Sequence, residues 1–546
     1  MCLAVACGDE TAPVGGAGGG GGTVDFPDPL GPVAAVTSTK TDRFATSGAC
    51  RQCHLAGEGP ELLDPVTGED LSPVGQWRSS MMAFAARDPL YLAVVSEELA
   101  AAPDPEPVEA LCIRCHGPAG SEEAGAANAH LGLDELLTGT TPAANLGRDG
   151  VTCSLCHQIQ DRSLGDVESF SGGFSVGYDR EMYGPHESPR TDPMEFFVEY
   201  TPAFADHIGK SELCATCHTV ITPIVEDGEH VGDFVEQGPY LEWLNSSFSP
   251  GTSCASCHLP TVDSAGDPLV SAIATYPETI GPREPFGVHS FEGANAYMLT
   301  ILSQNIEWTG SDVLPSELEA AAERSRLHLA TAADLTIAVP AVEAGVTKVT
   351  VTVENRTAHK LPTGYPGRRL WLHAVATDAG GATVFESGSW DGAGAILGAG
   401  GARLDGAGVV LPHRDVVTSS AEVALWESVP AGSDGEPTFV PLSAVSYAKD
   451  NRILPSGWSS SGPWTKWTHP VGVGGDSTYA PGRDSVTYHL PSAAAALVIE
   501  LVYESVPPAL AEHLAKVPTP AAVRFSQMAS QTPPRPEVIA TAQRAW

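Results

Sequence analysis

The chain has 546 residues, with 29 Lys or Arg against 67 Asp or Glu, and its formal net charge is −38. This acidity disfavours nucleic acid and anionic membranes as primary partners; it suits a cationic partner, or simply a well-solvated surface. A chain of this length is expected to form roughly two to four domains.

The N-terminal residues indicate export and a membrane anchor. The run Leu-Ala-Val-Ala-Cys resembles the lipobox of bacterial lipoproteins, with Cys7 as the acylated residue, although too few residues precede it for a full signal peptide. The Gly-rich run GGAGGGGG follows as a flexible tether. We therefore expect residues 1–40 to be a truncated lipoprotein signal and tether. The expected location is the periplasm or the outer-membrane surface, and a plain soluble periplasmic protein is the alternative.

Ten of the twelve cysteines occur in one recurring pattern, Cys-x-x-Cys-His, written CRQCH, CIRCH, CSLCH, CATCH and CASCH. This pattern attaches c-type haem: two thiols bond to the porphyrin, and the adjoining histidine binds the iron. A zinc site needs no histidine directly after the second cysteine, and redox dithiols usually occur singly, so zinc or disulfide clusters are the weaker alternative. We predict five covalent haem c groups.

The predicted attachment cysteines are Cys50, Cys53, Cys112, Cys115, Cys153, Cys156, Cys214, Cys217, Cys254 and Cys257. The predicted proximal iron ligands are His54, His116, His157, His218 and His258. The chain around these motifs is rich in Gly, Pro and short polar connections and would bury little core of its own. We therefore expect residues 41–312 to form a pentahaem domain of short helices and loops wrapped around stacked porphyrins.

The spacing of the motifs suggests an internal repeat. Successive first cysteines are 62, 41, 61 and 40 residues apart, as if a block of about 102 residues were used twice. In that register Met82 aligns with His186, and His130 falls close to His230. Each of these residue types can bind iron, but coincidence is as good an explanation in a chain with 17 histidines.

A change of hydrophobic period marks a second domain. Residues 314–335 read as a helix capped by Ser316 and Glu319, which gives a connecting helix over residues 313–333. Alternating strands follow at 334–339, 347–355, 370–378 and 382–388, with Gly380 and Gly381 as a hairpin turn, and further strands are expected within 438–447, 485–490 and 496–504. The predicted fold class is multidomain α+β, with an antiparallel β-sandwich over residues 334–546.

Each iron also needs a sixth ligand or leaves that position open. A second histidine gives a saturated, low-potential electron carrier, a methionine raises the potential, and an open position permits substrate binding. Histidines of the β domain are expected to be structural: His373, His413, His469, His489 and His513. The candidate distal ligands are Met82, His130, His186, His207, His230, His289 and His359.

Several long segments carry a family resemblance: WRSSMMAFAARDPLY, RDGVTCSLCHQI, EQGPYLEW, HSFEGANAYML, ENRTAHKLPTGYPGRRLWL and KDNRILPSG. Together they resemble the bacterial pentahaem c-type cytochromes, which are distantly related to the tetrahaem cytochromes and the hydroxylamine oxidoreductase group. The resemblance covers the chain from Ala49 to about Tyr503.

The resemblance implies that His289 and His359 are distal haem ligands. Related cytochromes often have Ser-x-His where this chain has Ser80-Met81-Met82, so Met82 is expected to bind one iron as a thioether, or to pack on a porphyrin face. Arg368 and Arg369 are candidates to pair with haem propionates, with an exposed basic pair as the alternative.

Two function classes follow. The first is electron transfer through five haems between a membrane-side or periplasmic donor and an acceptor, with redox proteins as partners. The second is reduction of nitrite, hydroxylamine or a sulfur oxyanion at one open haem. Pentahaem nitrite reductases typically carry one Cys-x-x-Cys-Lys site, and none of the five motifs here ends in lysine, which favours electron transfer.

Overall fold

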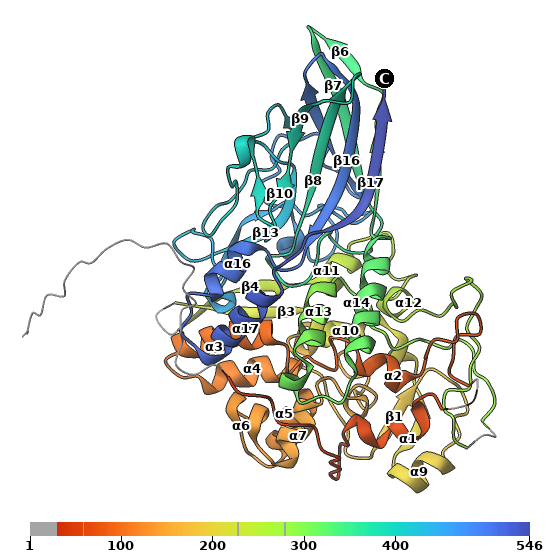
Figure 1. Ribbon diagram of the computed structural model, residues 1–546. Helices are drawn as coiled ribbons and strands as arrows, with labels where there is room; N and C mark the ends of the chain where they lie inside the picture. Colours follow the sequence, from red (N-terminus) through yellow and green to blue (C-terminus); the bar gives the residue numbers. More distant parts are fainter. Residues whose placement is uncertain (1–29, 58, 60, 227–228, 278–279) are drawn as a thin grey trace, which may run out of the picture.

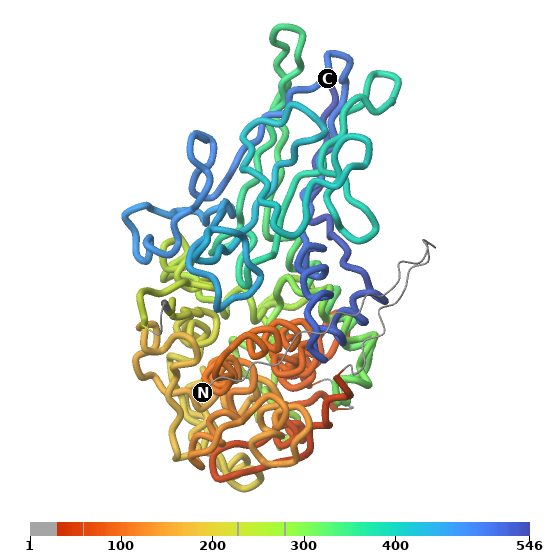
Figure 2. The backbone as a smooth tube through the Cα atoms, turned by 90° about the vertical axis from the view of Figure 1, so that its left-hand side faces the viewer, coloured from red at the N-terminus to blue at the C-terminus, as the bar shows by residue number. Residues whose placement is uncertain are grey.

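A computed structural model of the chain describes residues 30–57, 59, 61–226, 229–277 and 280–546. The predicted anchor at Cys7 and its tether lie outside the described residues. The protein has a helical part, formed mainly by residues 30–330, and a part built of two β-sheets that rises from it (Figures 1 and 2). No helix among the described residues has the length and apolar character needed to cross a membrane.

The helical part consists of short helices, many of which start at a proline, whose fixed φ suits the first turn of a helix. Two small two-stranded sheets lie among them: β1 (Glu181–Gly184) pairs in parallel with β2 (Thr201–Phe204), and β3 (Val220–Glu226) pairs antiparallel with β4 (Glu229–Gln237). The helices are α1 (Arg51–His54), α2 (Pro73–Arg78), α3 (Pro89–Ala101), α4 (Glu106–His116), α5 (Pro118–Ala126), α6 (Leu133–Thr138), α7 (Pro142–Arg148), α8 (Cys153–Cys156), α9 (Asp192–Val198), α10 (Ser211–His218), α11 (Pro239–Leu244), α12 (Cys254–His258) and α13 (Ala296–Gln304).

The expected connecting helix is present as α14 (Pro315–Leu329), but its predicted cap is wrong. The helix begins before Ser316, and the carboxylate of Glu317 accepts a hydrogen bond from the backbone N–H of Leu314 at 2.7 Å. Glu319 instead accepts from the Ser303 hydroxyl at 3.3 Å, because that position already lies inside the helix and faces α13.

The β part contains two sheets, antiparallel apart from the parallel pair β12–β15. One sheet has the order β12-β15-β7-β5, with β6 beside β7, and the other has the order β14-β13-β8-β16-β17, with β9 beside β8. The strands are β5 (Ala333–Ile337), β6 (Ala341–Glu343), β7 (Val346–Asn355), β8 (Arg369–Asp378), β9 (Thr383–Ser387), β12 (Val416–Val417), β13 (Leu425–Ala431), β14 (Ser446–Asp450), β15 (Arg483–Leu490), β16 (Ala494–Glu504) and β17 (Glu537–Ala545), and a separate pair is formed by β10 (Ser389–Trp390) and β11 (Ile396–Leu397).

Most predicted strands are confirmed, because their alternating pattern matches the two-residue repeat of a strand with one buried face. Along β7, for example, Val349, Val351 and Val353 are fully buried between more exposed neighbours. The strand expected within 438–447 is largely absent, since β14 starts only at Ser446. Pro441 lies in that stretch and cannot donate a ladder hydrogen bond.

One hydrophobic cluster joins the two sheets. Val351 of β7 and Val486 of β15 belong to it from one sheet, and Leu372 of β8 and Ile499 of β16 from the other. All four side chains are fully buried. The main core of the β part therefore lies between the sheets.

The C-terminal residues return to the helical part before the last strand. Helices α16 (Pro508–Leu514) and α17 (Pro520–Gln531) interrupt the β region and lie beside α3, as the C-terminal blue helices next to the orange ones show (Figure 1). Leu510 and Phe525 share a buried cluster with Leu92 and Ile113. These helices, which the sequence analysis does not predict, pack the end of the chain against its beginning.

Candidate functional site

All five Cys-x-x-Cys-His motifs lie in or at the end of short helices, namely α1, α4, α8, α10 and α12. Residues three apart share a helix face, so the two cysteines of each motif point to the same side, and the histidine follows directly. None of the ten motif cysteines takes part in a disulfide. This local geometry gives each motif two thiols and one imidazole on adjoining positions.

The thiols of different motifs meet in a branched order. Side-chain interactions join Cys153 of the third motif to Cys50 of the first, and Cys214 of the fourth to Cys254 of the fifth. The fourth motif also reaches the second, through Cys217 and Cys115, and the third, because Cys217 lies close enough to influence the pKa of Cys156. The motifs therefore run first–third–fourth, with the second and fifth branching from the fourth.

Four motif histidines and two candidate distal ligands share one hydrogen-bond pattern, which leaves Nε2 of each ring unprotonated. In six of them Nδ1 lies 2.5–3.0 Å from a backbone carbonyl, which only accepts, so Nδ1 carries the proton and Nε2 keeps its lone pair. This partner is typical of histidines that bind a metal. The pairs are His54 with Ile273, His116 with Ala85, His157 with Tyr183, His258 with Glu292, His289 with Gly287 and His359 with Lys360.

Two of the motif histidines face a second histidine across a gap. The ring centroids of His157 and His289 are 6.2 Å apart with planes within 20°, and those of His258 and His359 are 6.4 Å apart within 18°. Metal–nitrogen bonds of about 2 Å, plus about 1.1 Å from each nitrogen to its ring centre, separate two axial imidazoles by about 6 Å. Both pairs thus have the spacing of two ligands on one iron.

The motifs border space inside the protein. The His218 side chain is exposed, yet desolvation lowers its pKa to about 4, and the half-buried thiols of Cys112 and Cys156 have a pKa raised by burial to about 12. A side chain that is accessible to solvent although protein surrounds it must line a space inside the protein. Burial likewise lowers the pKa of His116, His289 and His359 to about 4, which favours the neutral imidazole that binds metals. The residues of the second, third and fourth motifs therefore fit a haem beside each of these motifs.

His116 has a different ring neighbour. Tyr91 of α3 stacks on its imidazole, with centroids 3.6 Å apart and planes within 4°. The Tyr91 hydroxyl is buried without a hydrogen-bond partner. Burial raises the pKa of Tyr91 well above its usual value, and Cys112 and Cys115 add to the shift, so the phenol lies beside the second motif. Sequence reasoning did not single out this tyrosine.

Three candidate histidines already use Nε2. His130 pairs with Glu109 at 2.9 Å, His230 with Asp233 at 2.9 Å, and the buried His207 donates to the carbonyl of Ile159 at 2.8 Å. The structure brings none of these three into ring contact with a motif histidine among the described residues. Their role as ligands stays a prediction.

The aligned candidates Met82 and His186 lie in different surroundings. The half-buried Met82 packs against a cluster that includes Trp77 and Phe84, and its carbonyl accepts from Val151, two residues before the third motif. His186 lies in the loop between β1 and α9, and desolvation and Arg283 lower its pKa. Met82 is thus near the third motif, and among the described residues neither side chain makes a ring contact with an imidazole.

Sequence reasoning missed His328, which lies near the C-terminal end of α14. Its ring centroid is 5.4 Å from that of His258, tilted by 55°, and burial lowers its pKa to about 4. The helical repeat could have indicated it, because His328 lies three residues after the buried Ser325 and seven after the buried Ala321, on the same face of the helix.

The two arginines after the Lys-Leu-Pro-Thr-Gly segment differ. Arg369 is buried in ion pairs with Asp405 at 2.5 Å and Glu504 at 2.7 Å, so its charge is already matched. Arg368 donates to Asn295 at 3.1 Å and lies near enough to His218 to help lower the pKa of that histidine. Of the pair, Arg368 is the one that lies beside a motif.

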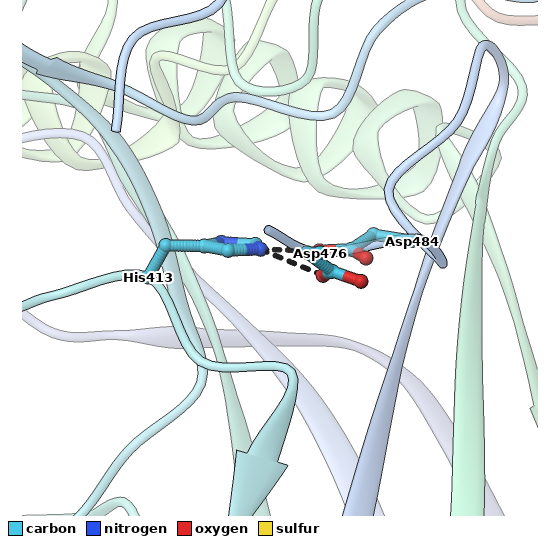
Figure 3. A group of neighbouring side chains, drawn as sticks. All are labelled: His413, Asp476 and Asp484. Carbon is cyan, nitrogen blue, oxygen red and sulfur yellow. Dashed lines mark hydrogen bonds and ion pairs between the residues drawn. The ribbon is translucent and has the colours of Figure 1, made fainter. Parts of the chain in front are cut away.

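A separate polar cluster in the β part joins His413, Asp476 and Asp484 (Figure 3). Backbone groups fix the Asn451 amide so that its NH₂ donates to Nδ1 of His413 at 2.9 Å. Nε2 must therefore carry the proton, which it donates to Asp476 at 2.9 Å. That nitrogen has no lone pair for a cation, and the cluster is a buried hydrogen-bonded group.

No protein-family model and no curated protein matches the chain. Among solved structures, it is similar to a penta-heme cytochrome c552 from Thermochromatium tepidum, with a TM-score of 0.52 and 16% sequence identity, over 92% of this chain and 99% of that one. The similarity spans both the helical and the β part. The chain therefore has a multihaem cytochrome-like fold.

Proposed function

We propose that this protein is a multihaem c-type cytochrome that passes electrons through five covalently bound haems between redox partner proteins. The observation that carries the proposal is the continuous order of the five motifs, first–third–fourth with the second and fifth joined to the fourth. Porphyrins held by motifs that lie this near to one another would be neighbours, so electrons would cross little intervening polypeptide.

The two facing histidine pairs support a carrier role for two of the haems. His157 with His289, and His258 with His359, would fill both axial positions of an iron. A bis-histidine haem is saturated and of low potential, which suits electron transfer rather than substrate binding.

A reductase with one open haem is the second candidate. Among the described residues, ring contacts supply a facing imidazole at the right spacing to the third and fifth motifs, whereas His116 of the second motif contacts Tyr91. An iron at His116 without a second protein ligand would offer a position for nitrite, hydroxylamine or a sulfur oxyanion.

We also propose that residues 41–312 form the haem domain and that the two sheets of residues 334–546 form a sandwich. Their shared core and the placement of His359 support this division. The periplasm or the outer-membrane surface, with a lipid anchor at Cys7, is the proposed location, since haem attachment of this type follows export.

The test is to express the chain with a haem-attachment system, count the haems and record spectra of the reduced protein with and without carbon monoxide. The proposal expects five haems per chain and little spectral change with carbon monoxide. A bare polypeptide mass would contradict it, and a large change together with nitrite turnover would favour the reductase.

A further inference from the structure

The helical and β parts meet at a buried charge network beside His359. Glu242 comes from α11, whereas Lys360, Asp450 and Arg452 come from the β region. The Lys360 side chain is fully buried, and the exposed fractions of the other three side chains are 3% or 1% for the acids and 7% for Arg452. Two cations and two anions thus balance in the interior.

Glu242 makes three contacts across this boundary. One carboxylate oxygen accepts from the backbone N–H of Lys360 at 3.0 Å and from the Thr363 hydroxyl at 2.6 Å. The other lies 3.1 Å from Arg452. Glu242 is thus the member through which the helical part holds the segment that carries His359.

The rest of the network fixes that segment from the β side. Asp450 accepts two hydrogen bonds from Arg452, at 2.7 and 2.8 Å, and one from Lys360 at 2.6 Å. The amide of Asn355 donates to the carbonyl of His359 at 2.8 Å. The chain at residues 359 and 360 is therefore held from both sides.

The direction of the His359 ring depends on this backbone. Its Nδ1 donates to the carbonyl of Lys360 at 3.0 Å, and the N–H of that same residue is the group that Glu242 holds. A shift of the peptide at Lys360 would therefore turn the imidazole away from His258, which it faces at 6.4 Å.

We propose that Glu242 is the positioning residue that sets His359 opposite His258 as the distal ligand of the fifth haem. This inference rests on the proposed function. The carboxylate acts through hydrogen bonds to the backbone of the ligand segment and through its charge, which matches Arg452. Replacement by glutamine would keep the size of the side chain but leave a buried cation without a matching anion. The new NH₂ group would also point either at Arg452 or at the Lys360 N–H, and both of these groups are donors.

The experiment compares Glu242→Gln with two matched variants in the full haem-loaded chain. His359→Ala defines the spectrum when the distal ligand is lost. Glu504→Gln is the control, because Glu504 is also a buried carboxylate paired with an arginine, Arg369, but among the described residues it makes no hydrogen bond or ion pair with the His359 segment. Haem number, ferric spin state by electron paramagnetic resonance, and carbon monoxide bound per chain are measured for each.

Glu242→Gln is expected to keep five haems and to gain about one high-spin haem and one carbon monoxide per chain over wild type, as His359→Ala does. Added imidazole should return this haem to low spin, whereas Glu504→Gln should keep the wild-type spectrum. A Glu242→Gln protein with the wild-type spin state and carbon monoxide binding overturns the inference and leaves the proposed function intact. The same change in Glu504→Gln also overturns it.

If Glu242→Gln does not accumulate, Thr363→Val tests the same carboxylate with all four charges retained. It removes one of the three contacts and is expected to produce a smaller high-spin fraction that imidazole reverses. An unchanged spectrum overturns the inference. A wild-type chain without haem would instead overturn the proposed function, so the two failures are distinguishable.

Discussion

The imidazoles of His258 and His359 face one another at 6.4 Å with planes within 18°, although one belongs to the fifth motif and the other to the β region. If one iron joins them, that bond links the two parts of the protein. Helices α16 and α17, packed on α3, form a second link. The β part is then a carrier of a haem ligand as well as a scaffold.

Removal of the ring tests this link directly. His359→Ala is expected to open one haem, which becomes high-spin and binds about one carbon monoxide per chain more than wild type. His469→Ala is a suitable control because His469 is an exposed histidine of the same part of the chain. Equal carbon monoxide binding by both variants would contradict the assignment of His359.

His289→Met is expected to raise the midpoint potential of one haem by roughly 0.1–0.3 V, within the ~0.8 V range that axial ligands span. The reason is that a thioether replaces the imidazole facing His157 across 6.2 Å. Spectroelectrochemical titration measures the shift. His230→Met should leave every potential unchanged, since the exposed His230 pairs with Asp233, and a shift there would mean that His230 binds iron.

The branched order of the motifs predicts unequal effects of removing haems. Replacing both Cys214 and Cys217 by serine should leave four haems and slow electron equilibration between the first and third haems and the second and fifth, because the fourth motif lies near three others. Replacing Cys112 and Cys115 should also leave four haems, but the remaining ones stay connected. Flash photoreduction compares the two, and equal equilibration rates would argue against the fourth motif as the branch point.

Leu372→Ala tests the core between the sheets and its connection to the helical part. Leu372 is fully buried, so the substitution should cost about 2–5 kcal/mol of unfolding free energy. Denaturant unfolding followed both by β-sheet circular dichroism and by haem absorbance should shift in both probes. Val342→Ala, at a side chain that is 70% exposed, should change stability by no more than about 0.5 kcal/mol. A shift in the sheet probe alone would mean that the two parts unfold separately.

The carboxyl group of Glu98 is expected to make the free energy of unfolding depend on pH. Burial raises the pKa of this glutamate to about 7, and the neighbouring Glu97 adds to the shift against a hydrogen bond from Leu442. Between about pH 4.5 and 7 the folded chain therefore holds a proton that the unfolded chain has released. This group makes the free energy of unfolding fall as the pH rises through that range, and its contribution then levels off. Glu98→Gln should flatten that decline in denaturation curves, and an unchanged slope would contradict the shift.

Local chemistry made much of the protein predictable from its sequence. Cys-x-x-Cys-His places two thiols on one helix face with an imidazole beside them, whatever the surrounding fold, so the motif residues were evident at once. The strands β7 and β15 were equally evident, because one face of each packs into the core between the sheets and the sequence must then alternate.

Only the tertiary structure decided which residues meet. His289 faces His157, His359 faces His258, and Tyr91 stacks on His116. The two residues of each pair come from different segments, and the sequence does not show that these segments fold side by side. His328 was missed for the same reason, since a helical histidine shows its neighbour only after the helix has packed. The charge network of Glu242, Lys360, Asp450 and Arg452 likewise exists only where two distant parts of the chain fold together, because buried charges are tolerated only beside their partners.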